Sequence, residues 1–262
     1  MKKIAAFAIV ILLLGGLFVS SGRKDELTEE VNKAYQEGEQ AATIASRQEN
    51  FNKALALLLQ LEREYSPLFG TGRLYYATGN TLFQLENYPE AILYYEKARK
   101  LMPREKILQD RLATARKKLF LPEKPSAETL RKWLNSFLPL SLPERLQIFF
   151  ALAFVLFLVF SVSLWSKKTL KPLKYILLFP LVLIGCTLLY TRYFSPVEAI
   201  MVHAAMLQKG PGLQYNKTTD APLPAGSQVE ALAPVADGSW FKVLTPNGDF
   251  GYVQGRTLRF ID

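Results

Sequence analysis

Two long apolar runs between residues 146 and 194 constrain this chain more than any other feature. The first run, Leu146–Trp165, holds twenty residues without a charged side chain. The second, Leu173–Phe194, has only Lys174 near its start and Arg192 near its end. A helix needs about 20 mostly apolar residues to cross the hydrocarbon core of a bilayer. The lengths therefore predict two transmembrane helices, and the alternative is a pair of buried helices in a soluble core.

A lysine-rich connection joins the two runs. Residues 166–172 contain three lysines, and Lys174 follows shortly after. Short cytoplasmic loops of membrane proteins carry an excess of Lys and Arg. We therefore expect a two-span hairpin over residues 146–194, with a cytoplasmic turn and with both ends, and the domains attached to them, outside the cytoplasm.

The N-terminus has the order of a secretory signal. Two lysines precede the apolar run Ile4–Val19, and three small residues end at Gly22. A basic start, an apolar core and small residues at the end are typical of a cleavable signal peptide. Residues 1–22 are therefore interpreted as a signal peptide, with an uncleaved anchor helix as the alternative.

Charge and residue counts exclude several classes of function. The formal net charge is +9, but the basic excess lies at the N-terminus and around the apolar runs, where it indicates topology and not a nucleic-acid surface. Cys186 is the only cysteine and His203 the only histidine. Neither an intrachain disulfide nor a His-based metal site or catalytic relay can be built from these. We therefore expect no enzyme activity, no cofactor and no bound metal.

Residues 25–119 have the pattern of helices with an internal repeat. Glu49–Ala54 is echoed 37 residues later by Glu86–Ala91, and self-similarity near this period indicates stacked helical hairpins. In the second unit, small and aromatic residues alternate where two helices must approach closely: Tyr75, Gly79, Leu82, Tyr88, Ala91, Tyr95 and Ala98. This pattern resembles the tetratricopeptide repeat, and these residues are the expected packing positions.

The first unit of the array follows the pattern less closely. Its expected packing residues are Ala42, Ala45, Phe51, Ala54, Leu58 and Leu61. Residues 104–119 carry leucines at helical spacing and are expected to form the capping helix that repeat arrays need. An ordinary helical bundle is the alternative for the whole of residues 25–119.

The first helix of the second unit carries another stripe beside its packing face. Arg73, Tyr76, Asn80 and Phe83 recur at spacings of three and four residues, so they share one side of the helix. In the tetratricopeptide family the matching positions line a concave groove that holds partner peptides, and the resemblance implies partner binding here. Arg and Tyr are frequent in binding hot spots, and an Asn amide can bond a peptide backbone. The alternative is that Tyr76 and Phe83 pack on the first repeat.

Residues 126–139 separate the array from the apolar runs. If these residues form a helix, their apolar side chains lie on one face, with Arg131 and Lys132 on the opposite face. The apolar residues are Leu130, Trp133, Leu134, Phe137 and Leu138. This pattern predicts an amphipathic helix in the membrane interface, and packing on the array is the alternative. Ser141 and Glu144 then have the spacing of a capping box, which predicts the start of the first apolar helix.

Residues 197–262 change to short β-rich runs separated by turn residues. The expected strands include Ala199–Val202, Val229–Leu232, Trp240–Leu244 and Phe250–Val253. About five such strands in so short a segment predict a small barrel. Gly238–Val243, followed by the Asn247-Gly248 turn and by Gly251–Val253, resembles bacterial SH3-like domains. Trp240, Val243, Gly251 and Tyr252 are the expected barrel core, and ligand binding by Trp240 and Tyr252 is the alternative.

The expected fold class is multi-domain: an all-α tetratricopeptide-like array, a two-helix transmembrane hairpin and a small all-β SH3-like barrel. The order of signal, repeats, hairpin and barrel resembles the BatE family of the Bacteroides aerotolerance (Bat) operon. The resemblance implies an inner-membrane scaffold facing the periplasm, with von Willebrand A domain Bat proteins as partners and a role in stress tolerance. The alternative is an envelope protein whose barrel binds peptidoglycan.

Overall fold

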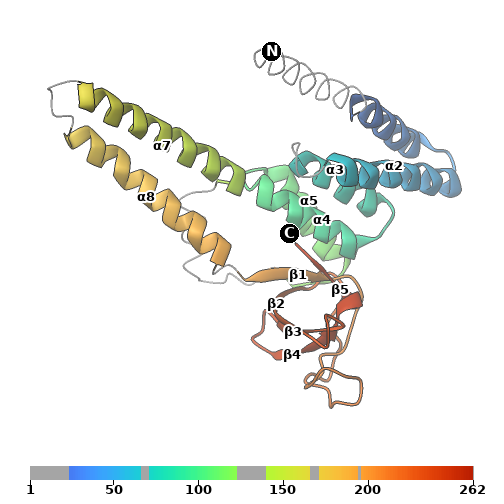
Figure 1. Ribbon diagram of the computed structural model, residues 1–262. Helices are drawn as coiled ribbons and strands as arrows, with labels where there is room; N and C mark the ends of the chain where they lie inside the picture. Colours follow the sequence, from blue (N-terminus) through green and yellow to red (C-terminus); the bar gives the residue numbers. More distant parts are fainter. Residues whose placement is uncertain (1–23, 66–70, 123–139, 166–170, 194–195, 262) are drawn as a thin grey trace, which may run out of the picture.

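The computed structural model describes residues 24–65, 71–122, 140–165, 171–193 and 196–261. The signal peptide predicted over residues 1–22 and the interfacial helix predicted over 126–139 lie outside these residues, as does most of the lysine-rich connection. The described residues form a helical array, a pair of long helices and a β-sheet (Figure 1).

The array is built from helices that pack through apolar side chains at helical spacing. A helix over residues 24–40 is followed by α2 (Ile44–Tyr65), α3 (Thr71–Gln84), α4 (Tyr88–Leu101) and α5 (Lys106–Lys118). Large buried side chains between them come from every element after the first, and they include Phe51, Leu58, Leu82, Tyr95 and Leu108. The predicted all-α array is confirmed.

The first hairpin of the array turns earlier in the chain than the 37-residue offset predicts. Because α4 begins at Tyr88, that offset would start α2 at Phe51, yet α2 begins at Ile44. Ala42 and Ala45 are exposed as a result, so their predicted place between the helices is wrong. The close approach lies at Gly38 instead, where a Cβ atom would be 3.0 Å from Cε1 of Phe51.

The long helices α7 (Leu142–Trp165) and α8 (Lys171–Tyr193) pack side by side and project away from the array (Figure 1). Residues Leu142–Ser163 and Pro172–Thr191 are long and apolar enough to cross a membrane. Their large apolar side chains point outward, and Phe157 is 64% exposed. In the array, by contrast, large apolar side chains are buried between the helices.

The start of α7 has the predicted capping box. The Ser141 backbone N–H donates to Glu144 Oε2 at 2.7 Å, and the Glu144 N–H donates in return to Ser141 Oγ at 3.4 Å. These reciprocal bonds satisfy backbone donors that a helix start leaves unpaired. Glu144 also pairs with Arg104 in the segment between α4 and α5, so an ion pair joins the base of α7 to the array.

The C-terminal part is an antiparallel sheet. Its strands are β1 (Val197–Met201), β2 (Gln228–Val235), β3 (Trp240–Leu244), β4 (Phe250–Gln254) and β5 (Leu258–Phe260), with a 3-10 turn, η1 (Gly255–Thr257), before the last. Their order is β4-β3-β2-β1-β5, and each neighbouring pair is antiparallel. The predicted short strands are confirmed, and they form an antiparallel sheet. In the described part of the chain no ladder joins β4 to β5, so the sheet is open and is not the closed barrel that was expected.

Period-two alternation divides the strand side chains between the two faces of the sheet. One face holds a buried cluster: Ala199, Met201, Leu207, Val229, Val243, Val253 and Leu258. Of the expected core residues, Val243 and Gly251 are buried, and a Cβ atom on Gly251 would lie 2.3 Å from Cγ of Leu207. Trp240 and Tyr252 alternate with core-facing neighbours, and both are half-buried outside this cluster.

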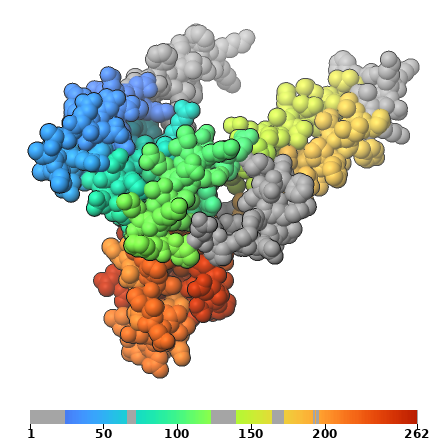
Figure 2. Space-filling view, turned by 180° about the vertical axis from the view of Figure 1, so that it is seen from behind, coloured from blue at the N-terminus to red at the C-terminus, as the bar shows by residue number. Residues whose placement is uncertain are grey.

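The other face of the sheet packs on the array at β1. Ile200 and Ile261 complete the array core beside Ile92, and Lys100 Nζ donates to the Ile261 carbonyl. Gly226, with φ of +84°, permits close contact because a Cβ atom there would lie 2.6 Å from Cδ1 of Leu119. Figure 2 shows the sheet, in orange, seated directly on the end of the array, in green. The array and the sheet therefore share one core, although α7 and α8 lie between them in sequence.

Candidate functional site

The candidate site is the side of the array that faces away from α2 and α4. We call it the inner face, and it is formed by the helix over residues 24–40, by α3 and by α5. Gly79 lets α3 lie close to α4, since a Cβ atom at that position would be 2.6 Å from Cδ1 of Tyr95. The buried Tyr95 hydroxyl then donates to Asn80 Oδ1 at 2.8 Å. This bond fixes the Asn80 amide at the border of the inner face.

The Asn80 side chain keeps its donors for a ligand. An Asn amide has one oxygen acceptor and two N–H donors. The oxygen accepts from Tyr95, while no residue in the described ranges accepts from the Asn80 nitrogen. An extended peptide backbone offers carbonyl oxygens that match these donors.

A polar network joins the first hairpin to the second across the inner face. The Tyr35 hydroxyl is hydrogen-bonded to the Gln84 side chain, and Arg47 Nη2 donates to Gln84 Oε1 at 2.7 Å. The Tyr35 ring packs edge-on against Phe51 with centroids 5.2 Å apart. Gln84 thus receives partners from two helices of the first hairpin, which sets how the two hairpins stack.

The hydroxyls of Tyr35 and Tyr95 stay protonated over the physiological range. Burial raises the pKa of Tyr95, and Arg111 of α5 opposes that rise. Burial likewise raises the pKa of Tyr35, while the hydrogen bond from Gln84 and the charge of Arg111 oppose it. Arg111 itself is exposed. It therefore adds a cation to a face whose phenols remain neutral donors.

The four residues predicted to bind a partner occupy different surroundings. Arg73 is exposed, and no ion pair in the described part of the chain engages it. Tyr76 is half-buried, with its ring 6.0 Å from that of Tyr95. Phe83 packs edge-on against Tyr88 at 5.2 Å. Tyr76 and Phe83 thus contact the second helix of their own hairpin, whereas Arg73 and Asn80 present groups to solvent.

The predicted packing residues lie between α3 and α4. Five of the seven are buried: Gly79, Leu82, Ala91, Tyr95 and Ala98. Tyr75 and Tyr88 are half-buried, and the Tyr75 ring lies 6.0 Å from that of Tyr94. The aromatic residues of this hairpin thus pair across the helix contact, which leaves the rest of α3 to form the inner face.

Sequence reasoning missed Tyr35, Gln84 and Arg111 as members of the inner face. The motif is clear in the second unit alone, and the first unit turns at a different place from the one that the motif predicts. The register of residues 24–40 and of α5 was therefore not fixed by it. The sequence contains only a weak signal for these residues. Each is a polar or aromatic residue on a helix of the array, and their common face is recognised only when the helices are placed side by side in the structure.

Comparison with known families identifies part of this site. Residues 72–105, which contain α4 and nearly all of α3, match the tetratricopeptide repeat family. No curated protein matches the chain. Within the described residues, no group of three His, Cys, Asp or Glu side chains is placed to hold a metal ion. The array therefore contains a tetratricopeptide repeat, a module that typically serves protein–protein interaction.

Proposed function

We propose that this protein is a membrane-anchored adaptor that holds an extended segment of a partner protein on the inner face of its array. The observation that carries the proposal is the set of donors there. Arg73 and Arg111 are exposed cations, and Asn80 presents an amide nitrogen. Peptide carbonyl oxygens and acidic side chains are the groups that such donors bind. The partner segment is therefore extended and acidic.

The shared core of the array and the sheet supports membrane anchoring by a hairpin. The array precedes α7 and the sheet follows α8, yet Ile200 and Ile261 pack among array residues. Two parts in contact must lie on the same side of a membrane, and two crossings return the chain to the side from which it left. The lysines of residues 166–172 favour a cytoplasmic turn. We infer that the array and the sheet lie in the periplasm, at the inner membrane.

The order of the parts carries the proposal one step further. A signal-like N-terminus, repeats, two apolar helices and a C-terminal sheet with an SH3-like sequence pattern resemble the BatE family. On that resemblance we place the adaptor in a Bat-type stress-tolerance complex with von Willebrand A domain proteins. The donors of its inner face, Arg73, Asn80 and Arg111, would then hold an acidic segment of one of those partners.

Co-purification after cross-linking in native membranes tests the adaptor role. Replacing both Arg73 and Arg111 with alanine in the full chain is expected to abolish recovery of the cross-linked partner. The matched control replaces Lys53 and Arg63, which are exposed on α2. Both doubles should keep the melting temperature, since none of the four side chains is buried. Undiminished recovery with the inner-face double would overturn the proposal.

Asn80 is left unchanged in that experiment for a structural reason. Its oxygen accepts from the buried Tyr95 hydroxyl. Alanine at this position would leave a buried donor unpaired, which costs about 1–3 kcal/mol. Loss of the partner in an Asn80 variant could then reflect partial unfolding of the array and not loss of a contact.

A second candidate function is binding of peptidoglycan by the sheet. Trp240 and Tyr252 lie outside the buried cluster, and Phe250, two residues from Tyr252 on β4, is exposed. Aromatic side chains at a surface can stack on apolar faces of a ligand. If the sheet binds the wall, Trp240→Ala should lower retention of the full chain on isolated sacculi, whereas Leu232→Ala on β2 should not. Equal retention of both variants would remove this candidate.

A further inference from the structure

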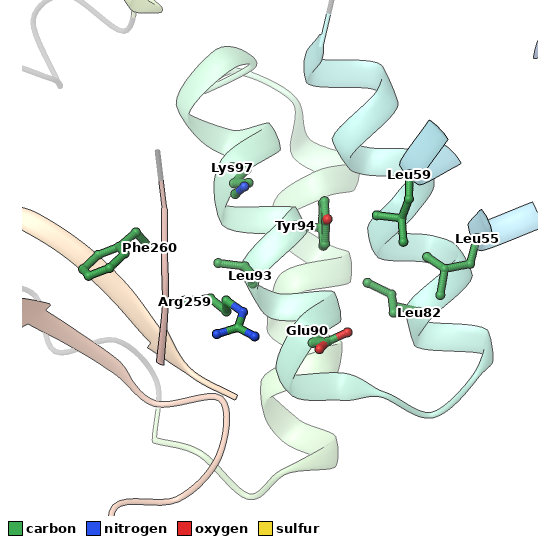
Figure 3. A pocket seen from close by; sticks show the side chains of 9 residues that line it. All are labelled: Leu55, Leu59, Leu82, Glu90, Leu93, Tyr94, Lys97, Arg259 and Phe260. Atoms are coloured by element: carbon green, nitrogen blue, oxygen red, sulfur yellow. The ribbon is translucent and has the colours of Figure 1, made fainter. Parts of the chain in front are cut away.

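A groove opens between the array and the sheet, on the side away from the inner face. Its walls are Leu55 and Leu59 of α2 on one side and Arg259 and Phe260 of β5 on the other, and its floor includes Leu93 and Tyr94 of α4 (Figure 3). The cavity has a volume of about 420 Å³. All of these residues belong to the described part of the chain.

A network of polar contacts holds the floor of the groove in place. The Tyr94 hydroxyl donates to Glu62 Oε2 at 3.0 Å. Lys97 Nζ lies 3.8 Å from Glu62 Oε1 and 5.4 Å from the centroid of the Tyr94 ring. Lys97 is thus committed to Glu62, and its charge is neutralised at that end of the groove. A floor of this kind is preorganised, which lowers the entropic cost of binding.

The backbone of β5 offers an unpaired edge to the groove. Among the described residues, β5 pairs with β1 alone, at the border of the sheet. Val202 N donates to the Thr257 carbonyl and Ile261 N to the Glu198 carbonyl, so odd-numbered residues of this segment turn their backbone groups toward β1. By the antiparallel alternation, the N–H and C=O groups of Leu258 and Phe260 point the other way.

Arg259 sits at this edge and is the cation of the groove that has no acidic partner among the described residues. Its Nη1 donates to the carbonyl of Leu258 at 3.3 Å, which is one of the outward groups of β5. Glu90, across the groove, accepts from Asn87 Nδ2 at 3.0 Å. The guanidinium therefore occupies the place that an N–H group of an added strand would take.

We propose that this groove binds a short extended peptide that adds as a strand to β5. Backbone bonds to Phe260, and to Leu258 once the Arg259 guanidinium turns from the Leu258 carbonyl to an acidic side chain of the peptide, supply the pairing, as in other cases of strand addition to a sheet edge. On the array side the peptide places an acidic side chain next to Arg259, with apolar side chains on either side against Leu59 and Leu93. The peptide side chains on the other face of the added strand contact Phe260.

This site differs from the inner face in position and in offering a strand edge. The inner face is lined by the first helices of the hairpins, whereas the groove is lined by the second helices and the sheet, together with Leu82 of α3. The groove also exists only because the sheet is docked on the array, so neither part alone contains it. A protein with both sites can hold two partner segments at once, one on each side of α4.

Binding of a synthetic peptide to the full chain in detergent tests the proposal. The probe is fluorescently labelled acetyl-Leu-Val-Asp-Val-Leu-amide, whose first, third and fifth side chains lie on one side of a strand. It should bind the wild-type chain saturably. The same peptide with Lys in place of Asp should bind at least tenfold more weakly. A peptide with Pro in place of the second Val should lose binding, because it lacks a backbone N–H.

A charge swap keeps the test specific to β5. Arg259→Glu should weaken the Asp peptide at least tenfold and strengthen the Lys peptide, while Arg256→Glu, at another exposed position three residues earlier, should alter neither. Leu59→Gln on the opposite wall should weaken the binding of both peptides.

Absence of saturable binding by the wild-type chain would overturn the proposal. It would also be overturned by equal affinities for the Asp, Lys and Pro peptides, or by Arg259→Glu leaving the peptide preference unchanged.

Discussion

The hairpin of α3 and α4 and the hairpin of α7 and α8 are both pairs of antiparallel helices, yet they place their side chains in opposite ways. Between α3 and α4 the aromatic rings turn inward, and Tyr95 is completely buried. On α7 and α8 they turn outward, and Phe179 is 73% exposed. A hairpin that folds against water gains stability from its interior, whereas one suited to lipid has little to gain there, since lipid tails are as apolar as its side chains. Both hairpins thus pair two antiparallel helices. Whether their large apolar side chains face the partner helix or the outside depends on whether water or lipid surrounds the hairpin.

The largest expected effect is the removal of a ring from each hairpin. Tyr95→Ala deletes a buried ring and orphans Asn80 Oδ1, and a truncation of this size in a core costs about 3–5 kcal/mol. Phe157→Ala removes a ring that is 64% exposed, so it should leave the stability of the array unchanged. Thermal unfolding of the full chain in detergent, followed by near-ultraviolet circular dichroism, measures the difference. Similar losses from both variants would mean that α7 and α8 support the array core.

A smaller difference should follow from adding one methyl group to each hairpin. At Gly79 a Cβ atom meets Cδ1 of Tyr95 at 2.6 Å, whereas at Gly185 the nearest atom is Cε2 of Phe149 at 3.5 Å. Overpacking in a tight core costs about 1–3 kcal/mol, so Gly79→Ala should lower the melting temperature of the array. Gly185→Ala meets only ordinary contact distance and serves as its control. A melting temperature unaffected by Gly79→Ala would show that α3 and α4 can separate without loss.

The smallest effect expected is an alkaline loss of stability through the tyrosines of the array. Burial raises the pKa of Tyr95, so this phenol stays protonated in the folded chain above pH 10, where the unfolded chain begins to ionise it. A raised pKa contributes stability that is complete below about pH 10 and is lost as the pH rises further. At pH 10.5 the contribution of one such tyrosine falls by about 0.8 kcal/mol.

A chemical denaturation series from pH 8 to 10.5 measures this effect. Tyr95→Phe removes the phenol, so its stability should fall less steeply with pH than that of the wild type. Phe83→Leu changes a ring of the same array without removing a phenol, so it is the control and its profile should run parallel to that of the wild type. A Tyr95→Phe profile parallel to that of the wild type would show that this tyrosine ionises equally in the folded and unfolded chain.

Features set by neighbours in the chain could be predicted from the sequence. The capping box at Ser141 and Glu144, the tight contact at Gly79 and the strand Trp240–Leu244 depend on periodicity, small residues and turns within a short segment. The orientation of Trp240 and Tyr252 was harder. The alternation of β3 shows two faces but not which of them becomes the core, because Phe241 and Val243 compete with Trp240 for that role.

Features set by distant elements could not be predicted in the same way. The inner face needs Tyr35 and Arg111 to meet on either side of α3, and the groove needs β5 to lie beside α4. Such contacts depend on how whole elements are oriented to each other, and a motif covering one repeat carries no information on that. The same holds for Ile200, whose sequence setting is that of any buried strand residue although it completes the core of the array.

The shared core also has a consequence for how this protein is made. Ile92 and Leu119 leave the ribosome well before Ile200, Gly226 and Ile261, so the array is synthesised with part of its apolar surface uncovered. For a hairpin inserted as proposed, that surface is covered only after the chain has been threaded through the bilayer twice and the sheet has emerged beside the array. A chain that inserts one helix and fails to insert the other leaves the sheet in the wrong compartment, with the array surface open to chaperones and proteases. For such a hairpin, correct insertion is a condition for folding, because strands translated after α8 complete a core that was begun before α7.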